Sequence, residues 1–345
     1  MQTAAVLHST EENREGFRRM FHEELDRWID ERVAPLFREG LRPTLRDLSQ
    51  MFQATRSEFL GPGLLELVTP DRETIARKIA EARGASENQP ILVVTADGAN
   101  MPLRPRAPRQ GKRGPGDYKD AKGFRLFLLG PGDRLIQVAS WHQVQDKAGL
   151  QEALSFIAQR IPVEQVRIAL LADGAPYLWD VLTTCFPTGR PTLDYYHCAQ
   201  HIHAVARIQY GESLLARQWA EAMKTRIWFG KVKGAVHHLR HGVVPFNPKA
   251  VDDIRKPINY LLANAERINY QANRQEGYPT GSGGMGSAHK AIYHTRIKRS
   301  GAWLVEESCN EMLRIRCAIY NGTFDRVFDH YMATQCPSVL RLENK

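Results

Sequence analysis

The sequence predicts an α/β protein whose core is a mixed β-sheet flanked by helices. Between residues 89 and 211, short apolar runs rich in β-branched residues alternate with amphipathic helical segments. Three of these runs follow one another before the first helical segment, which indicates a strand meander. Two runs end on Asp-Gly, a pair that is common where a strand stops. With 345 residues and 43% hydrophobic residues, the chain can bury a large core.

Residues 1–88 are expected to form a helical N-terminal domain. Apolar side chains recur at helical spacing from Phe17 to Ile29, and 71–82 is a second amphipathic segment. The stretch 44–60 has the spacing of a helix-turn-helix, which would make this a DNA-binding domain. Two packed helices without any DNA contact give the same pattern, and we favour that simpler interpretation.

Residues 89–211 are expected to form the first part of the core, in the order β-β-β-α-β-α-β-α. The strands are expected at 91–95, 124–129, 135–140, 166–171 and 192–194, and the helices at 147–159, at 177–183 and from Tyr195. This order is typical of an RNase H-like domain, a mixed sheet with helices on both faces.

The rest of the chain is expected to be helical. Residues 212–275 carry no strand signal and predict an all-helical insertion, with helices at 214–229 and 251–268. Residues 276–331 begin with a Gly-rich stretch and continue as the final helices of the core, and 332–345 form a tail.

Asp97 and Asp173 are the strongest candidates for chemistry. Each follows a short apolar run and precedes glycine, in VVTADGA and ALLADGA. Neighbouring strands would bring both carboxylates to one end of the sheet, where hard oxygen ligands suit Mg²⁺ or Mn²⁺ and phosphoryl transfer. A turn at each strand end is the alternative, but two such aspartates in this strand order favour metal ligation.

The stretch LDYYHCAQHIHAVA places Asp194 with His197, and Cys198 with His201, on shared helix faces. A zinc site needs about four ligands, and the only other cluster is the loose group at His237, His238 and His241. A packed, hydrogen-bonded role fits these four residues at least as well as metal binding.

Basic residues gather in two places that could hold a DNA backbone. A solvated surface would look the same, but the first group lies in a segment that leaves the strand carrying Asp97, which favours DNA contact. The candidates are Arg104, Arg106, Arg109, Lys112, Arg113, Lys119 and Lys122 in the first group, and Lys290, Arg296, Lys298 and Arg299 in the second.

A dinucleotide-binding spacing also occurs, because Gly281, Gly283 and Gly286 form G-x-G-x-x-G and Glu306 follows. That fingerprint requires an apolar strand before it. Here the preceding residues are RQEGYPT, so the match is taken as accidental.

Composition limits the kinds of partner and cellular location that fit this sequence. The net charge of +9 and the pI near 9.4 favour a polyanionic partner. The cysteines are five in number and widely spaced, so no disulfide framework is expected. Neither a signal peptide nor a run of eighteen apolar residues occurs, which predicts a soluble, intracellular, cytoplasmic protein with no membrane partner.

Taken together, four blocks resemble the Mutator-like DDE transposases of bacterial insertion sequences. They are ADGA at Asp97, ADGAPYLWD at Asp173, LDYYHCAQHI, and GSGGMGSAHKAIYHTRIKRSGAWLVEESCNEMLRIRCAIYNGTFD. They cover about residues 90–328 in the family's order. The resemblance implies an RNase H-like fold and transposition by cutting and joining DNA at terminal inverted repeats. It also implies a homodimer on double-stranded DNA, association with the bacterial nucleoid, and two Mg²⁺ ions held by two Asp and one Glu.

By position, the resemblance assigns the two aspartates to Asp97 and Asp173 and the glutamate to Gly286. Glycine has no side-chain oxygen, so one metal ion, or none, would be held and strand cleavage would be impaired. Two alternatives stay open. An active transposase could use another acid, from Glu276, Glu306, Glu307 and Glu311, or the chain could be a domesticated regulatory or interaction protein.

Overall fold

The computed structural model describes residues 64–104, 117–243, 250–281, 288, 290–294, 297, 304–327 and 330. The chain divides into two compact units, one of residues 65–324 and one of residues 1–64 with 325–345. The helices predicted before residue 64, the helix-turn-helix-like stretch 44–60 and the tail lie outside the described residues. The β-sheet and the helices that cover it belong to the unit 65–324.

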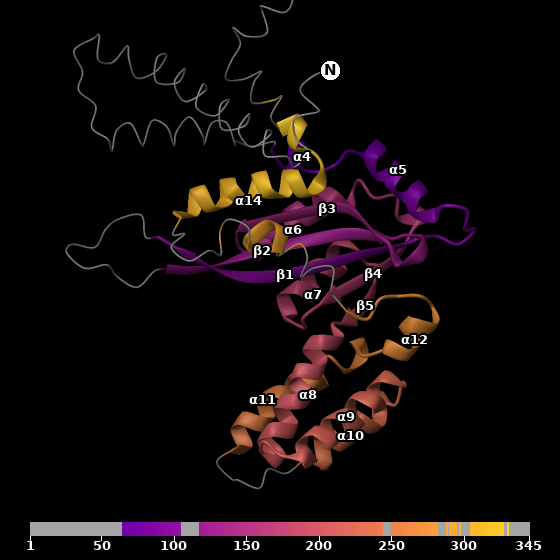
Figure 1. The fold of residues 1–345 in the computed structure, drawn as a ribbon, viewed down its shortest axis with the longest axis vertical. Helices are drawn as coiled ribbons and strands as arrows, with labels where there is room; N and C mark the ends of the chain where they lie inside the picture. Colours follow the sequence, from indigo (N-terminus) through magenta and orange to yellow (C-terminus); the bar gives the residue numbers. More distant parts are fainter. Residues whose placement is uncertain are drawn as a thin grey trace, which may run out of the picture. The chain divides into compact units, whose positions relative to one another are not determined.

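The core of this unit is a five-stranded mixed sheet in the order β3-β2-β1-β4-β5 (Figure 1). β1 pairs antiparallel with β2 and β2 with β3, whereas β1 with β4 and β4 with β5 are parallel. This is the RNase H-like arrangement, and the predicted mixed sheet flanked by helices is confirmed. The strands are β1 Ile91–Leu103, β2 Asp117–Leu129, β3 Leu135–Val144, β4 Arg167–Ala172 and β5 Arg190–Leu193.

The first hairpin is longer than the sequence predicts. β1 and β2 pair along their whole length, from Ile91 opposite Leu129 to Leu103 opposite Asp117. Asp97 therefore lies within β1, and the expectation that it follows the end of a short strand is wrong. The outer half of β2 carries polar and charged residues instead of an apolar run, so its sequence does not resemble a buried strand.

Helices cover both faces of the sheet. α6 (Lys147–Ala158) and α7 (Pro176–Cys185) contact each other, and α7 packs on β1 and β4. α14 (Glu306–Asn321) packs along β3, and Figure 1 shows it on the face opposite α7. α5 (Arg72–Arg83), which follows the short α4 (Leu64–Val68), contacts β2 and β3. None of the helices in the described part of the chain is long and apolar enough to span a membrane.

α14 also protects the free edge of β3. The Asn321 side chain accepts a hydrogen bond from the Ser140 N–H (2.7 Å) and donates one to its carbonyl (2.9 Å). Asn310 does the same for Val144, at 2.7 and 3.2 Å. An unpaired strand edge invites pairing with other chains, and these two amides occupy backbone groups that another strand would need.

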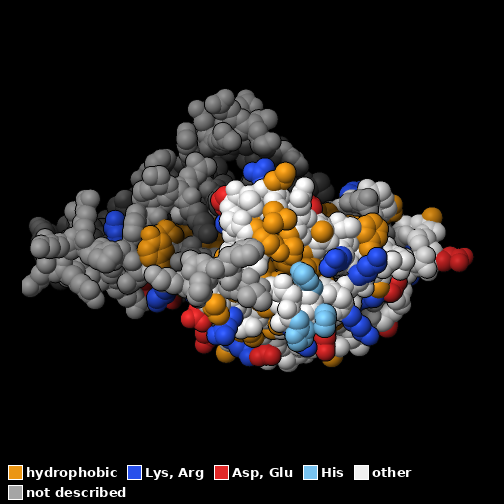
Figure 2. All heavy atoms as spheres, turned by 90° about the horizontal axis from the view of Figure 1, so that it is seen from below, with side chains coloured by type: hydrophobic (Ala, Val, Ile, Leu, Met, Phe, Trp, Pro, Cys, Tyr) orange, Lys and Arg blue, Asp and Glu red, His pale blue; other side chains and the backbone are white. Residues whose placement is uncertain are grey.

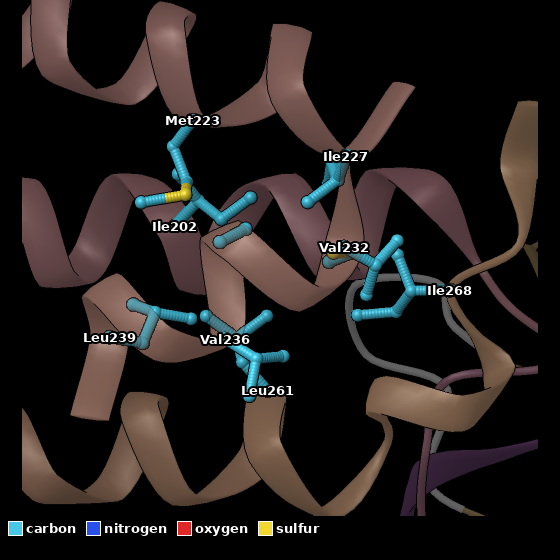
Figure 3. A pocket seen from close by; sticks show the side chains of 10 residues that line it. Ile202, Met223, Ile227, Val232, Val236, Leu239, Leu261 and Ile268 are labelled. Atoms are coloured by element: carbon cyan, nitrogen blue, oxygen red, sulfur yellow. The ribbon is translucent and has the colours of Figure 1, made fainter. Parts of the chain in front are cut away.

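After β5, the helix predicted from Tyr195 is followed, in the described residues, by the helices of the predicted all-helical region 212–275. In chain order, these helices are α8 Tyr195–Tyr210, α9 Leu214–Trp228, α10 Val232–His241, α11 Val251–Ala263 and α12 Tyr270–Gln275. α11 is shorter than the predicted 251–268, because Asn264 ends it and a single 3₁₀ turn follows. Apolar side chains from α8 to α11 meet around a cavity of about 10 Å³, as Figure 3 shows. A space of that size is at the lower limit for one water molecule.

Candidate active site

Asp97 and Asp173 meet at one edge of the sheet. In the parallel pair of β1 and β4, Thr95 lies opposite Leu171. Asp97 and Asp173 each come two residues later, so both reach the edge at which β4 ends. The Asp173 carboxylate accepts a hydrogen bond from the Ala175 N–H (3.0 Å), and Asp97 accepts one from the Gly98 N–H (2.7 Å).

The electrostatics agree with this proximity. Burial and the nearby carboxylates of Asp173 and Asp194 together raise the pKa of Asp97 to about 6, against the opposing effects of the Gly98 N–H and His197. Crowding of like charges is expected where carboxylates are gathered to receive a cation. The charge on Asp97 is therefore unfavourable in this structure.

α8 presents one face to this edge. Its cap Asp194 is almost fully buried and accepts a hydrogen bond from the His197 N–H (3.0 Å). One turn further, burial and His197 lower the pKa of His201. Cys198 points the other way, into the apolar interior of the helical insertion, and burial raises the pKa of its thiol to about 12. The four residues of the LDYYHCAQHI block are thus divided between the site and the adjoining core.

The helical insertion reaches the site through Tyr260 of α11. Its hydroxyl donates a hydrogen bond to the Asp173 carbonyl oxygen, and its ring stacks on His201 with centroids 3.6 Å apart. Gly174 makes this possible. Its φ of +91° suits glycine, and a Cβ there would lie 2.7 Å from the Tyr260 hydroxyl oxygen.

Tyr177 stands beside the two aspartates, and Lys122 lies near its ring. Burial raises the pKa of Tyr177 to about 12, with further contributions from Asp173, Asp120 and Asp97. Lys122 lies opposite Gly98 in the hairpin, and its ammonium group is 5.9 Å from the centre of the Tyr177 ring. The Lys122 ammonium also donates to the Gln145 carbonyl at 3.2 Å and lies 3.9 Å from the Asp120 carboxylate.

A short segment after the Gly-rich stretch packs on the sheet at the cross-strand neighbours of Asp97. Asp97 lies opposite Gly123, which in turn lies opposite His142. Tyr293 lies in the one-turn π-helix η7 (Lys290–His294). Its hydroxyl oxygen is 2.6 Å from the His142 Nδ1. Burial raises the pKa of Tyr293 well above its ordinary value, and the charge of Asp97 contributes.

Gly286 itself lies outside the described residues, as do all six residues 282–287. The neighbouring segments approach the site from both sides of this gap. Tyr293 does so on one side, and on the other the Thr280 carbonyl accepts a hydrogen bond from the Tyr195 N–H (2.9 Å).

Two of the four alternative glutamates form ion pairs with basic residues. Glu276 forms an ion pair with Arg190, and Glu306 forms one with Lys119 at 2.5 Å. Glu311 is buried in α14, where it raises the pKa of Arg314 against the lowering effect of burial. Glu307 is in the first turn of α14. The carboxylates that raise the pKa of Asp97 are Asp173 and Asp194.

Asp194 is a site residue whose electrostatic role the sequence did not reveal. Its position before the helix predicts a cap, and it is one. Nothing local indicates that its carboxylate also acts on Asp97. Tyr260 was missed entirely, because 87 residues separate it from Asp173 and no motif surrounds it.

The donor set at the edge suits a hard divalent cation, since Asp97 and Asp173 offer carboxylate oxygens. In the parts of the chain that the structure describes, no three His, Cys, Asp or Glu side chains converge into a complete ligand group. A third protein ligand would have to come from the undescribed stretch that contains Gly286, or be replaced by water.

Of the predicted DNA-binding residues, three have described side chains. Arg104 is exposed at the end of β1, and Lys119 and Lys122 lie on β2 instead of in a loop. Lys290 is described only in its backbone. The remaining seven lie outside the described residues: Arg106, Arg109, Lys112, Arg113, Arg296, Lys298 and Arg299.

α10 adds a basic surface that was not among the DNA-binding groups predicted from the sequence. Its exposed side chains include Lys233, His237, Arg240 and His241, and the segment 231–241 contains no acidic residue. Figure 2 views the molecule from the end of the helical insertion and shows histidines gathered with Lys and Arg nearby. By contrast, the basic residues of α11 are paired within one turn with Asp252 and Asp253.

The mixed sheet and its covering helices define an RNase H-like α/β protein. No known family model and no curated protein matches the chain. Among solved structures, the chain is similar to one titled "Drosophila P element transposase strand transfer complex". The identity is 10% and the TM-score 0.22, over 92% of this chain and 87% of that one.

Proposed function

We propose that this chain is a DNA-binding protein of the transposase type, in which Asp97 and Asp173 hold a divalent cation beside bound DNA. The observation that carries the proposal is the convergence of these two carboxylates on adjacent parallel strands, close enough to raise the pKa of Asp97. Gathering like charges costs stability, and a bound Mg²⁺ or Mn²⁺ offsets that cost.

The chemistry follows from the ligands. When bound, the cation would polarise a phosphate oxygen and stabilise the charge that develops on it. The chain's own groups position the carboxylates: Ala175 and Gly98 donate to them, and Tyr260 fixes the main chain at Asp173.

DNA is the proposed partner because the protein is basic and part of its positive charge lies on an exposed helix surface. The net charge of +9 favours a polyanion, and the exposed Lys233 and Arg240 of α10 extend the positive surface away from the site. The resemblance to Mutator-like transposases makes transposon-end DNA, bound by a homodimer, the specific form of the proposal.

Gly286 stands where that resemblance places the third acid, so we propose that strand cleavage is impaired while DNA binding remains. Asp97 and Asp173 alone would anchor a single ion, because a second ion needs a further carboxylate. Restoring an acid at position 286 is the change that should matter most.

The test combines DNA binding with cleavage. The wild-type protein should bind double-stranded DNA with an affinity that falls steeply as salt increases. With Mg²⁺ or Mn²⁺ it should cut DNA carrying the terminal repeats little or not at all, whereas the Gly286→Glu variant should gain cleavage. Adding Asp97→Asn or Asp173→Asn to that variant should abolish the gain. Absence of DNA binding at low salt would refute the proposal, and cleavage by the wild-type protein would show that another acid completes the site.

A further inference from the structure

Tyr196 is an exposed aromatic side chain at the border of the candidate site. It is the second residue of α8 and 65% of it is accessible to solvent. Isolated exposed rings are ordinary on protein surfaces. Tyr196 differs from them because its ring is held on two sides.

On one side, the Tyr196 ring contacts an aromatic cluster. The Tyr196 ring meets that of Tyr195 edge to face at 6.0 Å, and Tyr195 packs on Trp228 at 4.9 Å and on the fully buried Tyr270 at 5.3 Å. The base of the ring is therefore fixed to the core of the helical insertion. A ring fixed in this way loses little conformational entropy when it binds something.

On the other side, the Tyr196 ring lies next to the main chain at Gly281. A Cβ at this position would lie 3.2 Å from the Tyr196 Cε2 atom and 3.5 Å from Cδ2, so only glycine lets the backbone come this close without displacing the ring. The adjoining Thr280 carbonyl is held by the Tyr195 N–H. Tyr196 is thus fixed between the insertion and the segment that leads to Gly286.

The ring lies next to the carboxylates. Asp194, two residues earlier, caps α8, and its N–H donates to the Ala172 carbonyl (3.0 Å) directly before Asp173. A Cβ on Gly281 would lie 3.8 Å from an Asp194 carboxylate oxygen and 3.2 Å from the Tyr196 ring, so the ring and this carboxylate border the same point. A DNA strand whose phosphate reached Asp97 and Asp173 would therefore carry its bases past Tyr196. Within a duplex the faces of the bases are covered by stacking, so only an unpaired base could use the exposed ring.

We propose that Tyr196 is a stacking site for one unpaired nucleobase of DNA bound at the Asp97–Asp173 edge. The inference rests on the proposed function and specifies part of its substrate. Stacking on an aromatic ring tolerates any base, because every base has a π-face. The site therefore contributes affinity for an opened or single strand and no sequence preference.

The experiment compares a single-stranded oligonucleotide with its fully abasic counterpart, by fluorescence anisotropy at two salt concentrations. The wild-type protein should prefer the strand with bases. Tyr196→Ala should weaken binding of that strand by about 5- to 100-fold and leave the abasic strand unchanged. Tyr196→Phe should retain the preference, and Leu214→Ala, which removes a 70% exposed apolar side chain from α9, should not alter it. The salt dependence should be equal in all variants, because phosphate contacts are unaffected.

Other outcomes decide against the inference in distinguishable ways. If Tyr196→Ala binds both strands as tightly as the wild-type protein, or loses both equally, Tyr196 is not a base-stacking site while DNA binding stands. If the wild-type protein binds neither these strands nor a duplex at low salt, the proposed function fails and this inference fails with it.

Discussion

The surroundings of Asp97 at the sheet edge disfavour the ionised form of its carboxyl group. Its folded-state pKa of about 6 is above the ordinary 3.8, so between these pH values the folded protein binds more protons than the unfolded chain. The free energy of unfolding contributed by this group therefore falls as pH rises, and the penalty is fully present above about pH 6. A carboxylate that is costly to ionise is typical of functional sites.

Asp97→Asn should accordingly stabilise the protein at pH 7.5, by roughly 1–3 kcal/mol, and flatten the dependence of stability on pH between 4 and 6. Urea unfolding at several pH values measures this. Asp180→Asn is the matched control, because Asp180 is an exposed carboxylate on α7 paired with Lys147, and it should change stability little. A loss of stability in Asp97→Asn at pH 7.5 would contradict the electrostatic account.

Gly174 is a glycine of the site whose substitution is expected to be costly. Gly174→Ala meets two costs, the positive φ and the collision with Tyr260, whereas Gly211→Ala meets only the first, since a Cβ there has open space. We expect losses of about 1 kcal/mol for Gly211→Ala and about 2–4 kcal/mol for Gly174→Ala. Adding Tyr260→Ala should bring the cost of Gly174→Ala down to that of Gly211→Ala. Equal costs in the presence of Tyr260 would show that the close contact is not important.

At the scale of elements, α14 acts on the sheet through single side chains. Removing the Asn310 amide leaves the Val144 N–H and carbonyl of β3 without these partners, and removing Asn321 does the same at Ser140. Asn310→Ala should speed hydrogen exchange at Val144 and not at Ser140, and Asn321→Ala should do the reverse. Each should lower stability by about 1–3 kcal/mol. Uniform acceleration along β3 would indicate that the strand is held by α14 packing alone.

The sequence predicted the strands correctly where the whole apolar run of a strand is buried. The apolar runs in β1 and β4 are buried on both faces, so composition alone marks them. Prediction failed in the outer half of the β1–β2 hairpin, where cross-strand pairing and not burial holds polar residues extended. The end of α11 was missed for a similar reason, because Asn264 stops the helix while the amphipathic pattern continues.

At the scale of the molecule, the site is assembled from parts far apart in the chain. The pairing of Asp97 with Asp173 could be predicted, since each aspartate directly follows an apolar run and the order of these runs indicates neighbouring strands. The contributions of Tyr260 and Tyr293 could not, because each depends on how a distant helical segment packs against the sheet. The insertion and the segment after the Gly-rich stretch thus determine the site as much as the strands that carry the aspartates.

This assembly predicts that metal binding and folding are coupled. A cation that binds the two carboxylates lowers the pKa of Asp97 and relieves the repulsion, so its affinity should rise with pH through about 6. Thermal unfolding with and without Mn²⁺ at pH 5 and pH 7.5 measures the effect, and Mn²⁺ should raise the melting temperature more at pH 7.5. An equal increase at both pH values would place Mn²⁺ at other groups.

The most direct test of the central claim is calorimetric titration of Mn²⁺ into the wild-type protein, Asp97→Asn, Asp173→Asn and the control Asp180→Asn at pH 7.5. The account predicts one saturable site in the wild-type protein and in Asp180→Asn, weakened at least about tenfold in each of the other two, because either change leaves a single carboxylate. Unchanged Mn²⁺ binding in both Asp97→Asn and Asp173→Asn would contradict it.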